Sequence, residues 1–237
     1  NPGVSLFGAL GTSLVLAGTF GGQVAQQVRI AMAAISGLLV LVHEGPAGQK
    51  GGLRMPAAVT LVVAVCLVAV MLVRSVPPLP GLLVAYGRYS ATWVGINEII
   101  YSGEGITASV AVSRTPTGVL NYHNAGKVQA SSEPQDMRLQ RMLGHLTTLV
   151  PDNPQRVLVI GCGAGVTAGA VSVDPAVERV TIAEIEPLVV KTVSTYFSRY
   201  NHDVIRNPKV QGENDDARPF LVPTRRMFGG NRPDPQH

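Results

Sequence analysis

Arg156-Val-Leu-Val-Ile160, followed by Gly161-Cys-Gly-Ala-Gly165, is the stretch of sequence that decides the fold. A run of apolar residues typical of a buried strand passes directly into a turn with three glycines, and a helical stretch follows. A second strand-like segment, Arg179 to Glu184, ends in an acidic residue nineteen positions after Gly165. A strand, a glycine turn, a helix and a second strand ending in an acid form the pattern by which an α/β sheet holds an adenosine-bearing cofactor. The sequence therefore predicts a nucleotide-type site.

The glycine turn favours one class of cofactor over another. Glycines let backbone N–H groups approach a ligand closely and adopt conformations that a side chain penalises. The dinucleotide fingerprint needs a glycine or alanine at position 166, where this chain has Val166, so an NAD site is disfavoured. The Glu184 carboxylate can accept hydrogen bonds from both ribose hydroxyls, and its spacing also suits S-adenosylmethionine-type cofactors. No metal site is expected.

The first 80 residues differ in composition from the rest of the chain. They hold four basic residues and one acidic residue, whereas residues 81–237 hold fifteen basic and fourteen acidic residues. Ala57 to Val73 is a run of seventeen residues without charge. A helix needs roughly 17 to 25 apolar residues to cross a bilayer. Asn1 to Val28 is also free of charge, and Ile30 to Val42 is apolar but short. We therefore expect two or three membrane helices, with membrane lipid as a partner.

Two further features bear on function. The positive charges form no stripe with interleaved aromatic residues, so nucleic acid is not an expected partner. Tyr86, Tyr89 and Trp93 follow the apolar region, and they can lie at the level of lipid headgroups or pack against the following domain.

The chain begins with Asn1 instead of methionine, and the residues after 225 show no helix or strand pattern. We therefore expect a chain that is truncated at both ends.

The second part of the chain alternates between strand and helix patterns. Ile106 to Val112 alternates in polarity, and Val119 to His123 and Lys127 to Gln129 flank a turn, which predicts a small β-hairpin unit. Gln135 to Leu149 predicts a helix whose apolar residues share one face: Leu139, Met142, Leu143, Leu146 and Leu149. The strand and helix alternation that follows predicts a mostly parallel sheet.

These patterns together predict an α/β protein in three parts. We expect transmembrane helices in residues 1–80, a linker and β-hairpin unit in 81–133, and a Rossmann-like domain in 134–237. The last part is expected to be similar to class I methyltransferases, to bind the cofactor and to be incomplete at its C-terminal end.

Five short motifs in a fixed order indicate a family. They are Gly126-Lys-Val-Gln129, Met142-Leu-Gly-His-Leu146, the strand and glycine turn at 156–165, Glu184-Ile-Glu186 and Asp216-Ala-Arg-Pro-Phe220. Over about Tyr101 to Leu221 the chain resembles the polyamine aminopropyltransferases, the spermidine synthase family. It resembles more closely the form in which transmembrane helices precede the spermidine synthase-like domain. The resemblance implies transfer of an aminopropyl group from decarboxylated S-adenosylmethionine to a polyamine, by an integral membrane protein with its soluble domain in the cytoplasm.

The same resemblance assigns binding roles to seven residues. It implies that Gln129 and His145 line the cofactor pocket, that Glu184 binds the ribose and Asp216 the adenine, and that three glycines form the turn: Gly161, Gly163 and Gly165. It assigns no catalytic residue, because three family features are missing. Ala164 replaces an aspartate of the glycine turn, Leu139 replaces a tyrosine that holds the diamine, and an acidic Asp-x-x-Asp-Pro segment is absent.

The missing acidic segment leaves the activity open. A protonated amine has no lone pair, so a carboxylate must remove its proton before it can attack, and the chain as given is not expected to catalyse the transfer. One alternative is an S-adenosylmethionine-dependent methyltransferase, because Ala164 removes the residue that favours the decarboxylated cofactor. Another is a non-enzymatic membrane protein whose domain senses a nucleoside. The acceptor polyamine and a homo-oligomeric state stay open.

Overall fold

The computed structural model describes residues 18–43 and 55–221. The chain divides into two compact units, Asn1–Leu79 and Pro80–His237. The expectations for residues 1–17 and for the C-terminal end lie outside the described residues.

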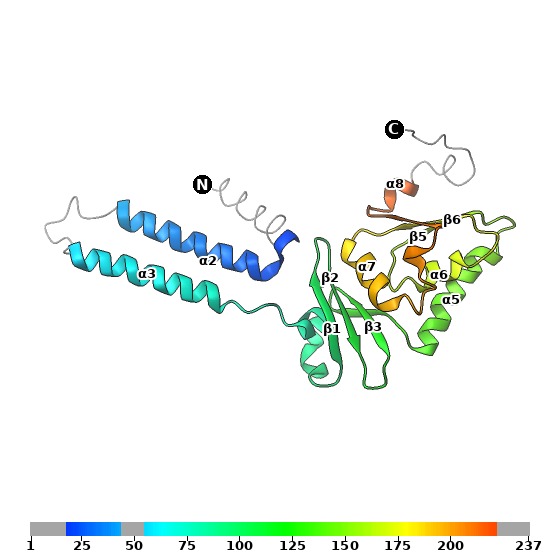
Figure 1. Ribbon diagram of the computed structural model, residues 1–237, viewed down its shortest axis with the longest axis horizontal. Helices are drawn as coiled ribbons and strands as arrows, with labels where there is room; N and C mark the ends of the chain where they lie inside the picture. The colour runs from blue at the N-terminus through cyan, green and yellow to red at the C-terminus, as the bar shows by residue number, and fades with distance from the viewer. Residues whose placement is uncertain (1–17, 44–54, 222–237) are drawn as a thin grey trace. The chain divides into compact units, whose positions relative to one another are not determined.

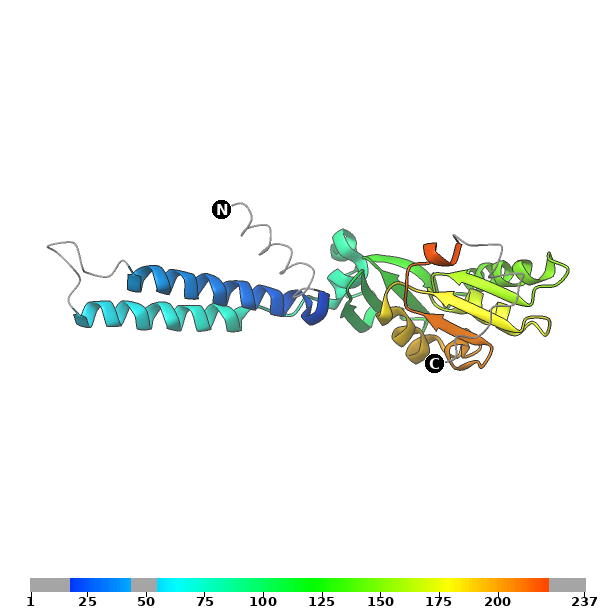
Figure 2. The same ribbon diagram turned by 90° about the horizontal axis from the view of Figure 1, so that it is seen from above.

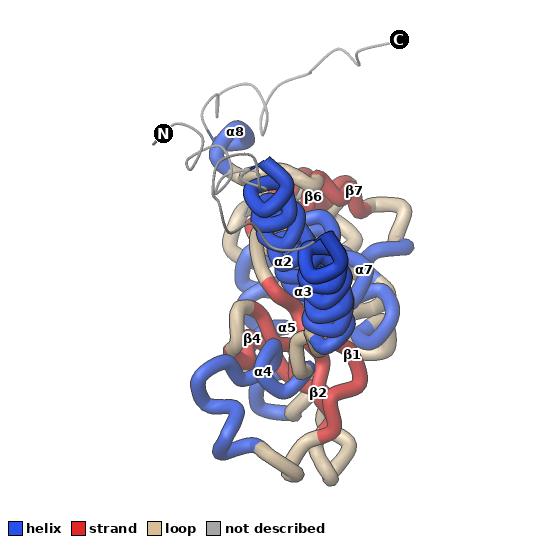
Figure 3. Tube along the Cα trace, turned by 90° about the vertical axis from the view of Figure 1, so that its left-hand side faces the viewer, coloured by secondary structure: helices blue, strands red, loops and turns tan. Residues whose placement is uncertain are grey.

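The first unit contains two long helices, α2 (Gly18–His43) and α3 (Met55–Ser75). They lie side by side (Figure 3), and two glutamines of α2 bind the C-terminal end of α3: Gln27 donates a hydrogen bond to the Val73 carbonyl (3.2 Å), and Gln23 donates one to the carbonyl of Val76, the residue after the helix (2.9 Å). Many apolar side chains of both helices are exposed. Among the described residues, Phe20–Val40 is long and apolar enough to cross a membrane, and Val59–Ser75 is a shorter apolar helix. The helix that meets the criteria of length and composition overlaps two expected runs, Asn1 to Val28 and Ile30 to Val42, whereas the expected span Ala57 to Val73 corresponds to the shorter helix.

The second unit begins with two short helices and an antiparallel sheet (Figure 1). The helices are α4 (Gly81–Tyr86) and the 3₁₀ helix η2 (Gly87–Trp93). The strands follow in the order β1 (Glu98–Glu104), β2 (Ser109–Arg114), β3 (Leu120–Asn124) and β4 (Lys127–Ser131). The predicted hairpin unit is therefore present, with one additional strand, β1. The expected alternation from Ile106 to Val112 covers the turn before β2 and only part of β2, and Ile106 itself is exposed.

Strand β2 is buried because both of its faces are covered. Val110 and Val112 pack into the main core, which also contains residues of the parallel sheet and its helices. Ala111 points to the other side and packs against Val84, Ala85 and Tyr86 of α4. Tyr86 is therefore a core residue (5% exposed), which decides its role in favour of packing, whereas Tyr89 and Trp93 are 52% and 37% exposed.

A three-stranded parallel sheet follows in the order β5 (Arg156–Ile160), β6 (Arg179–Ala183) and β7 (Val210–Glu213) (Figure 2). Helices and helical turns connect the strands and end the described part of the second unit: α6 (Val166–Ser172), α7 (Pro187–Thr192), η3 (Val193–Phe197), η4 (Val204–Arg206) and α8 (Arg218–Leu221). Ile160 of β5 lies opposite Ala183 of β6, which lies opposite Glu213 of β7. The carboxyl ends of the three strands therefore meet at one edge, and the predicted α/β class is confirmed.

Helix α5 (Pro134–Leu149) forms where the sequence predicts a helix, but it does not bury its most apolar face. Its buried residues are Met137, Gly144 and Thr148. A Cβ atom at Gly144 would lie 2.6 Å from the Thr167 carbonyl oxygen, so α5 and α6 approach closely because this residue is a glycine. The predicted apolar face is about half exposed or more: Leu139, Met142, Leu143, Leu146 and Leu149.

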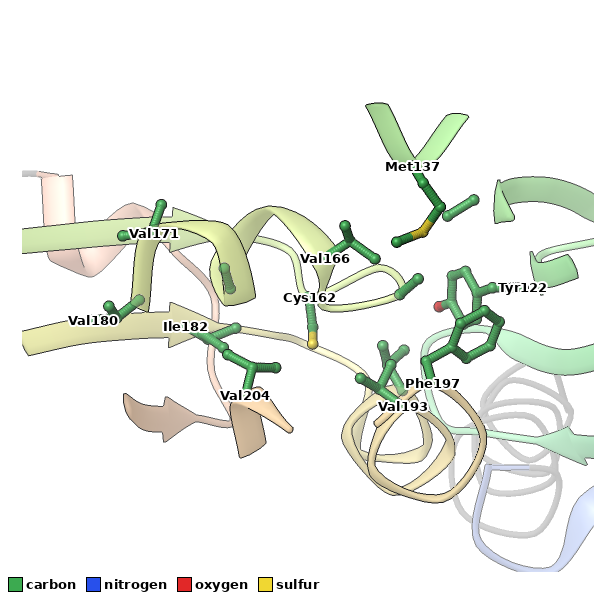
Figure 4. Packing of buried hydrophobic residues seen from close by; sticks show 14 of the residues in the cluster. Tyr122, Met137, Cys162, Val166, Val171, Val180, Ile182, Val193, Phe197 and Val204 are labelled. Atoms are coloured by element: carbon green, nitrogen blue, oxygen red, sulfur yellow. The ribbon is translucent and has the colours of Figure 1, made fainter. Parts of the chain in front are cut away.

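One hydrophobic core joins the two sheets of the second unit (Figure 4). Tyr122 of β3 and Phe197 of η3 meet edge to face, with ring centroids 6.5 Å apart. Met137 of α5, Cys162 of the glycine turn and Val166 of α6 belong to the same cluster. The hairpin sheet is thereby fixed beside the residues that follow β5.

Candidate functional site

The site begins at the edge where the three parallel strands end. The glycine turn, residues 161–165, follows β5, Glu184 follows β6, and Asp216 lies three residues after β7. Parallel strands in register place the residues that follow them next to one another, and the Glu184 N–H donates a hydrogen bond to the Glu213 carbonyl (2.9 Å). In an open α/β sheet this edge is where ligands bind.

The Glu184 carboxylate faces the glycine turn. Its Oε2 atom accepts a hydrogen bond from the Cys162 N–H (2.8 Å), and its Oε1 atom accepts one from the Glu186 N–H (3.0 Å). Glu184 is 8% exposed, so these two backbone donors fix the carboxylate in place. Each carboxylate oxygen has a second lone pair that can accept a hydrogen bond from a ligand.

The three glycines of the turn have different surroundings. All three have positive φ angles, at 79°, 54° and 75° for Gly161, Gly163 and Gly165. A Cβ atom at Gly161 or Gly163 would meet nothing within 4 Å, whereas one at Gly165 would lie 2.8 Å from Asn201 Nδ2 and 2.9 Å from Val193 Cγ1. Gly161 and Gly163 therefore leave open space beside the turn, and Gly165 allows α6 to pack against η3.

Asp216 lies near the same edge but already has a partner. Its carboxylate accepts hydrogen bonds from the Arg218 backbone N–H (2.9 Å) and from Arg218 Nε (2.8 Å). These side-chain and backbone hydrogen bonds from Arg218 hold the pKa of the Asp216 carboxyl below its ordinary value. An adenine amino group would have to share this carboxylate with the arginine.

Gln129 lies in a β-bulge beside Tyr122. The pairing of β3 with β4 shifts between Tyr122 opposite Ala130 and His123 opposite Val128, which leaves Gln129 as the extra residue. Its side chain is exposed. Bulges redirect a side chain, and they occur often next to binding sites. The sequence could not show this bulge, because it depends on how two strands pair.

His145 lies away from the glycine turn. It is exposed and lines a groove of about 720 Å³ on α5, together with Arg138, Arg141 and Tyr200. The Thr148 side chain is the main group that lowers the pKa of the Asp174 carboxyl, and His145 is among the charges that lower it further. Asp174 follows the C-terminal end of α6, whereas the glycine turn precedes its N-terminal end. The geometry does not bring His145 to the other predicted residues, and its binding role stays an untested prediction.

Glu186 has a structural role that sequence reasoning missed. It is 1% exposed, and its Oε2 atom accepts hydrogen bonds from the Thr107 N–H (2.8 Å), the Thr107 hydroxyl (2.9 Å) and the Ala108 N–H (3.2 Å). Its Oε1 atom accepts a bond from the Leu188 N–H (3.1 Å) at the start of α7. Burial alone would raise the pKa of this carboxyl, but the hydrogen bonds from Thr107, Leu188 and Ala108 outweigh burial and hold the pKa below its ordinary value.

Tyr122 is a second group that sequence reasoning missed. Figure 4 shows its hydroxyl directed toward the side of the cluster that holds Cys162. Burial raises the pKa of the Tyr122 hydroxyl, and the charges of Glu184 and Glu186 raise it further, against a hydrogen bond donated by Asn124 (3.2 Å). The hydroxyl is therefore neutral at physiological pH. The signal in the sequence is only an alternating strand, since Tyr122 is more than 60 positions before Glu184.

Comparison with known proteins shows what this part of the chain is similar to. Residues 136–229 match the spermine/spermidine synthase domain. The polyamine aminopropyltransferase of Sulfurisphaera tokodaii is 25% identical over 138 residues, which cover 54% of this chain and 46% of that protein. The polyamine aminopropyltransferase of Leptospira biflexa is 37% identical over 87 residues, which cover 37% of this chain and 31% of that protein. The chain spans less than half of the length of these curated relatives.

Two solved structures are also similar to part of the chain. The crystal structure of spermidine synthase from Thermotoga maritima is 22% identical with a TM-score of 0.49, and the match covers 52% of this chain and 43% of that chain. A spermidine synthase in complex with the transition state analogue AdoDATO has the same identity, coverage and TM-score. The domain match and the curated relatives show that this is a spermidine synthase-like protein, as its ordered motifs predict.

Proposed function

We propose that the second unit binds the adenosine part of decarboxylated S-adenosylmethionine, and that the protein belongs to a polyamine aminopropyltransferase system. The observation that carries the proposal is the Glu184 carboxylate, which two backbone N–H groups hold against a turn with open space beside Gly161 and Gly163. The curated relatives with this domain are named as polyamine aminopropyltransferases.

The chemistry of the transfer defines what a site of this kind must do. The lone pair of an amine nitrogen forms a bond to the aminopropyl carbon beside the sulfonium, while the carbon–sulfur bond breaks and leaves its electron pair on sulfur. The products are the extended polyamine and methylthioadenosine, and the proton of the amine passes to a base. Positioning of the two substrates supplies much of the rate of such a displacement.

Within this scheme the described residues account for binding of the donor. Glu184 accepts hydrogen bonds from the ribose hydroxyls, and the turn at Gly161 and Gly163 receives the part of the donor beside the ribose. Asp216 contacts the adenine amino group while its carboxylate also binds Arg218. A role for Gln129 of the hairpin sheet in the same pocket stays an untested prediction. We assign no described residue as the base, so we expect residues 1–237 to bind the donor without transferring its aminopropyl group.

Calorimetric titration with decarboxylated S-adenosylmethionine tests the proposal. We expect Glu184→Ala to lose about 1.5 to 3 kcal/mol, or about 10- to 150-fold in affinity, because a charged hydrogen-bond acceptor is removed. Glu178→Ala is the matched control, since Glu178 is exposed in the turn before β6. Equal affinity of the wild type and Glu184→Ala would refute the site.

A methyltransferase is the second candidate because of Ala164. This residue is 1% exposed, and its carbonyl accepts a hydrogen bond from Asn201 Nδ2 (3.0 Å), so no acidic side chain projects from this position of the turn. Tighter binding of S-adenosylmethionine than of its decarboxylated form would favour this reading. Binding of either donor without release of methylthioadenosine or methyl transfer, in a full-length protein supplied with putrescine, would favour a sensory role.

We also propose that the first unit lies in the membrane and that the second unit faces the cytoplasm, where polyamines and the donor are found. One described helix that meets the criteria for a span supports the first part. Protease protection in sealed vesicles of known orientation tests both parts, because only a second unit outside the lumen is digested. A homo-oligomeric state stays a prediction that cross-linking can address.

A further inference from the structure

The start of the second unit exposes an apolar segment that its fold does not cover. Residues 91–96 are all exposed, and only Thr92 among them is polar. Val94 is 67% exposed and Ile96 49%, and Leu83 and Tyr89 nearby are 47% and 52% exposed. Single exposed apolar residues are normal on protein surfaces, but contiguous apolar surface marks an interaction site. We call Leu83, Tyr89, Trp93, Val94 and Ile96 the apolar rim.

The apolar rim is held on a rigid support. The Trp93 ring stacks on the Tyr86 ring, with centroids 4.9 Å apart and planes 11° apart. Tyr86 is fixed in turn, since its hydroxyl accepts a hydrogen bond from Asn97 Nδ2 (2.6 Å) and lies 3.3 Å from the Ser113 hydroxyl. One face of the indole ring is therefore covered, and the side chain still exposes 37% of its surface. Its exposure is thus a property of the fold.

The charges around the apolar rim select the partner. Between Arg74 and Asn97 the sequence has two basic residues, Arg74 and Arg88, and no acidic one, and Glu98 just beyond is paired with Arg114 (3.5 Å). The Arg88 guanidinium lies 5.0 Å from the centroid of the Tyr89 ring, a cation–π contact on the surface. Tryptophan and tyrosine prefer the boundary between hydrocarbon and water, and arginine there meets lipid phosphates.

The connection to the first unit agrees with this partner. Only residues 76–80 lie between Ser75, the end of α3, and Gly81, the start of α4. A chain of this length reaches at most about 20 Å. If α3 lies in a bilayer, the apolar rim begins within reach of the headgroups. We propose that the apolar rim inserts into the headgroup layer of a membrane containing anionic lipid and so holds the second unit against the bilayer surface.

Trp93 gives a direct test because it is the only tryptophan of the chain. The full chain is reconstituted into vesicles of phosphatidylcholine and phosphatidylglycerol, and its fluorescence is recorded with lipids brominated near the carbonyl end of the acyl chain. We expect a blue-shifted emission, loss of most of the intensity to the brominated lipid, and protection from iodide in the water. If iodide quenches the emission as strongly as it quenches a tryptophan exposed to water, and brominated lipid does not quench it, the proposal is overturned. Failure of the chain to enter vesicles also overturns it.

Two variants make the test specific. A Trp93→Phe chain that carries Val173→Trp reports on a position that is 47% exposed after α6, and we expect iodide but not brominated lipid to quench it. Val94→Ser with Ile96→Ser removes apolar surface from the apolar rim and keeps the Trp93 reporter. We expect this variant to regain quenching by iodide, and unchanged protection would overturn the proposal that the apolar rim inserts. The proposal rests on the proposed membrane location of the first unit, but its test is independent of the proposed donor binding, because it uses no nucleoside.

Discussion

Replacement of Glu186 by glutamine is the change that probes the architecture of the site most sharply. The carboxylate joins the turn between β1 and β2 to the start of α7, and the N–H of Glu186 itself binds Glu184. Glutamine keeps the shape and one acceptor oxygen. With that oxygen facing the three donors at Oε2, the amide group faces the Leu188 N–H, which loses its acceptor. Loss of this bond and of the charge predicts a destabilisation of about 1.5 to 3 kcal/mol at neutral pH.

The pH dependence of this difference carries the main test. The pKa of Glu186 is lower in the folded chain than its ordinary value, so its carboxylate stabilises the fold above the ordinary glutamate range. The contribution is lost as the pH falls through the lowered pKa, where wild-type Glu186 also becomes neutral. The difference in unfolding free energy between the wild type and Glu186→Gln should therefore shrink toward acid pH, and titration of other groups cancels.

Urea unfolding at a series of pH values measures this difference, with Trp93 fluorescence as a signal from the second unit alone. Glu178→Gln is the control, because Glu178 is exposed and should show no change. A difference that stays constant from neutral to acid pH would refute the reasoning, since it would show that the charge of Glu186 contributes nothing.

Three further predictions concern single positions in the second unit. Gly105→Ala should destabilise the second unit by about 2 kcal/mol in urea unfolding, since its Cβ would overlap the Glu186 carboxylate, whereas Gly212→Ala, with open space, should have little effect. Burial and the Glu184 charge raise the pKa of Cys162 to about 12, so in a Cys66→Ser background iodoacetamide should label Cys162 only after unfolding; rapid labelling of the native protein would contradict this. Burial lowers the pKa of His123 to about 4, so the fold should lose up to about 3 kcal/mol as the pH falls from 6.5 to 4. His123→Gln should remove that slope, and a persistent slope would assign it to other groups.

The sequence predicts the parallel sheet and its edge well, because both depend on local pattern and on register. The strand at 156–160, the glycine turn and Glu184 follow one another within a short stretch, and parallel pairing then brings Glu184 to the turn. Strand β1 escapes prediction because Glu98–Glu104 begins and ends with an exposed glutamate, and its apolar run, Ile99 to Tyr101, is short and does not alternate with polar residues.

The remaining features depend on contacts between distant segments. The apolar face of α5 indicates a buried helix face, but Gly144 lets the opposite face approach α6, and tertiary packing decides. Glu186 resembles a solvated strand end in the sequence, whereas its partners Thr107 and Ala108 lie nearly 80 positions earlier. Motif spacing alone likewise could not place His145 on the outer groove of α5.

The central claim is that the ribose hydroxyls donate hydrogen bonds to Glu184. A double-mutant cycle in which one change is made in the ligand and the other in the protein tests it directly. Calorimetry measures the binding of methylthioadenosine and of its 2′,3′-dideoxy form to the wild type and to Glu184→Gln. The account predicts that the wild type prefers the ribose form by about 10-fold or more and that the variant loses most of this preference. An equal preference in both proteins would contradict it, because the hydroxyls would then be recognised elsewhere.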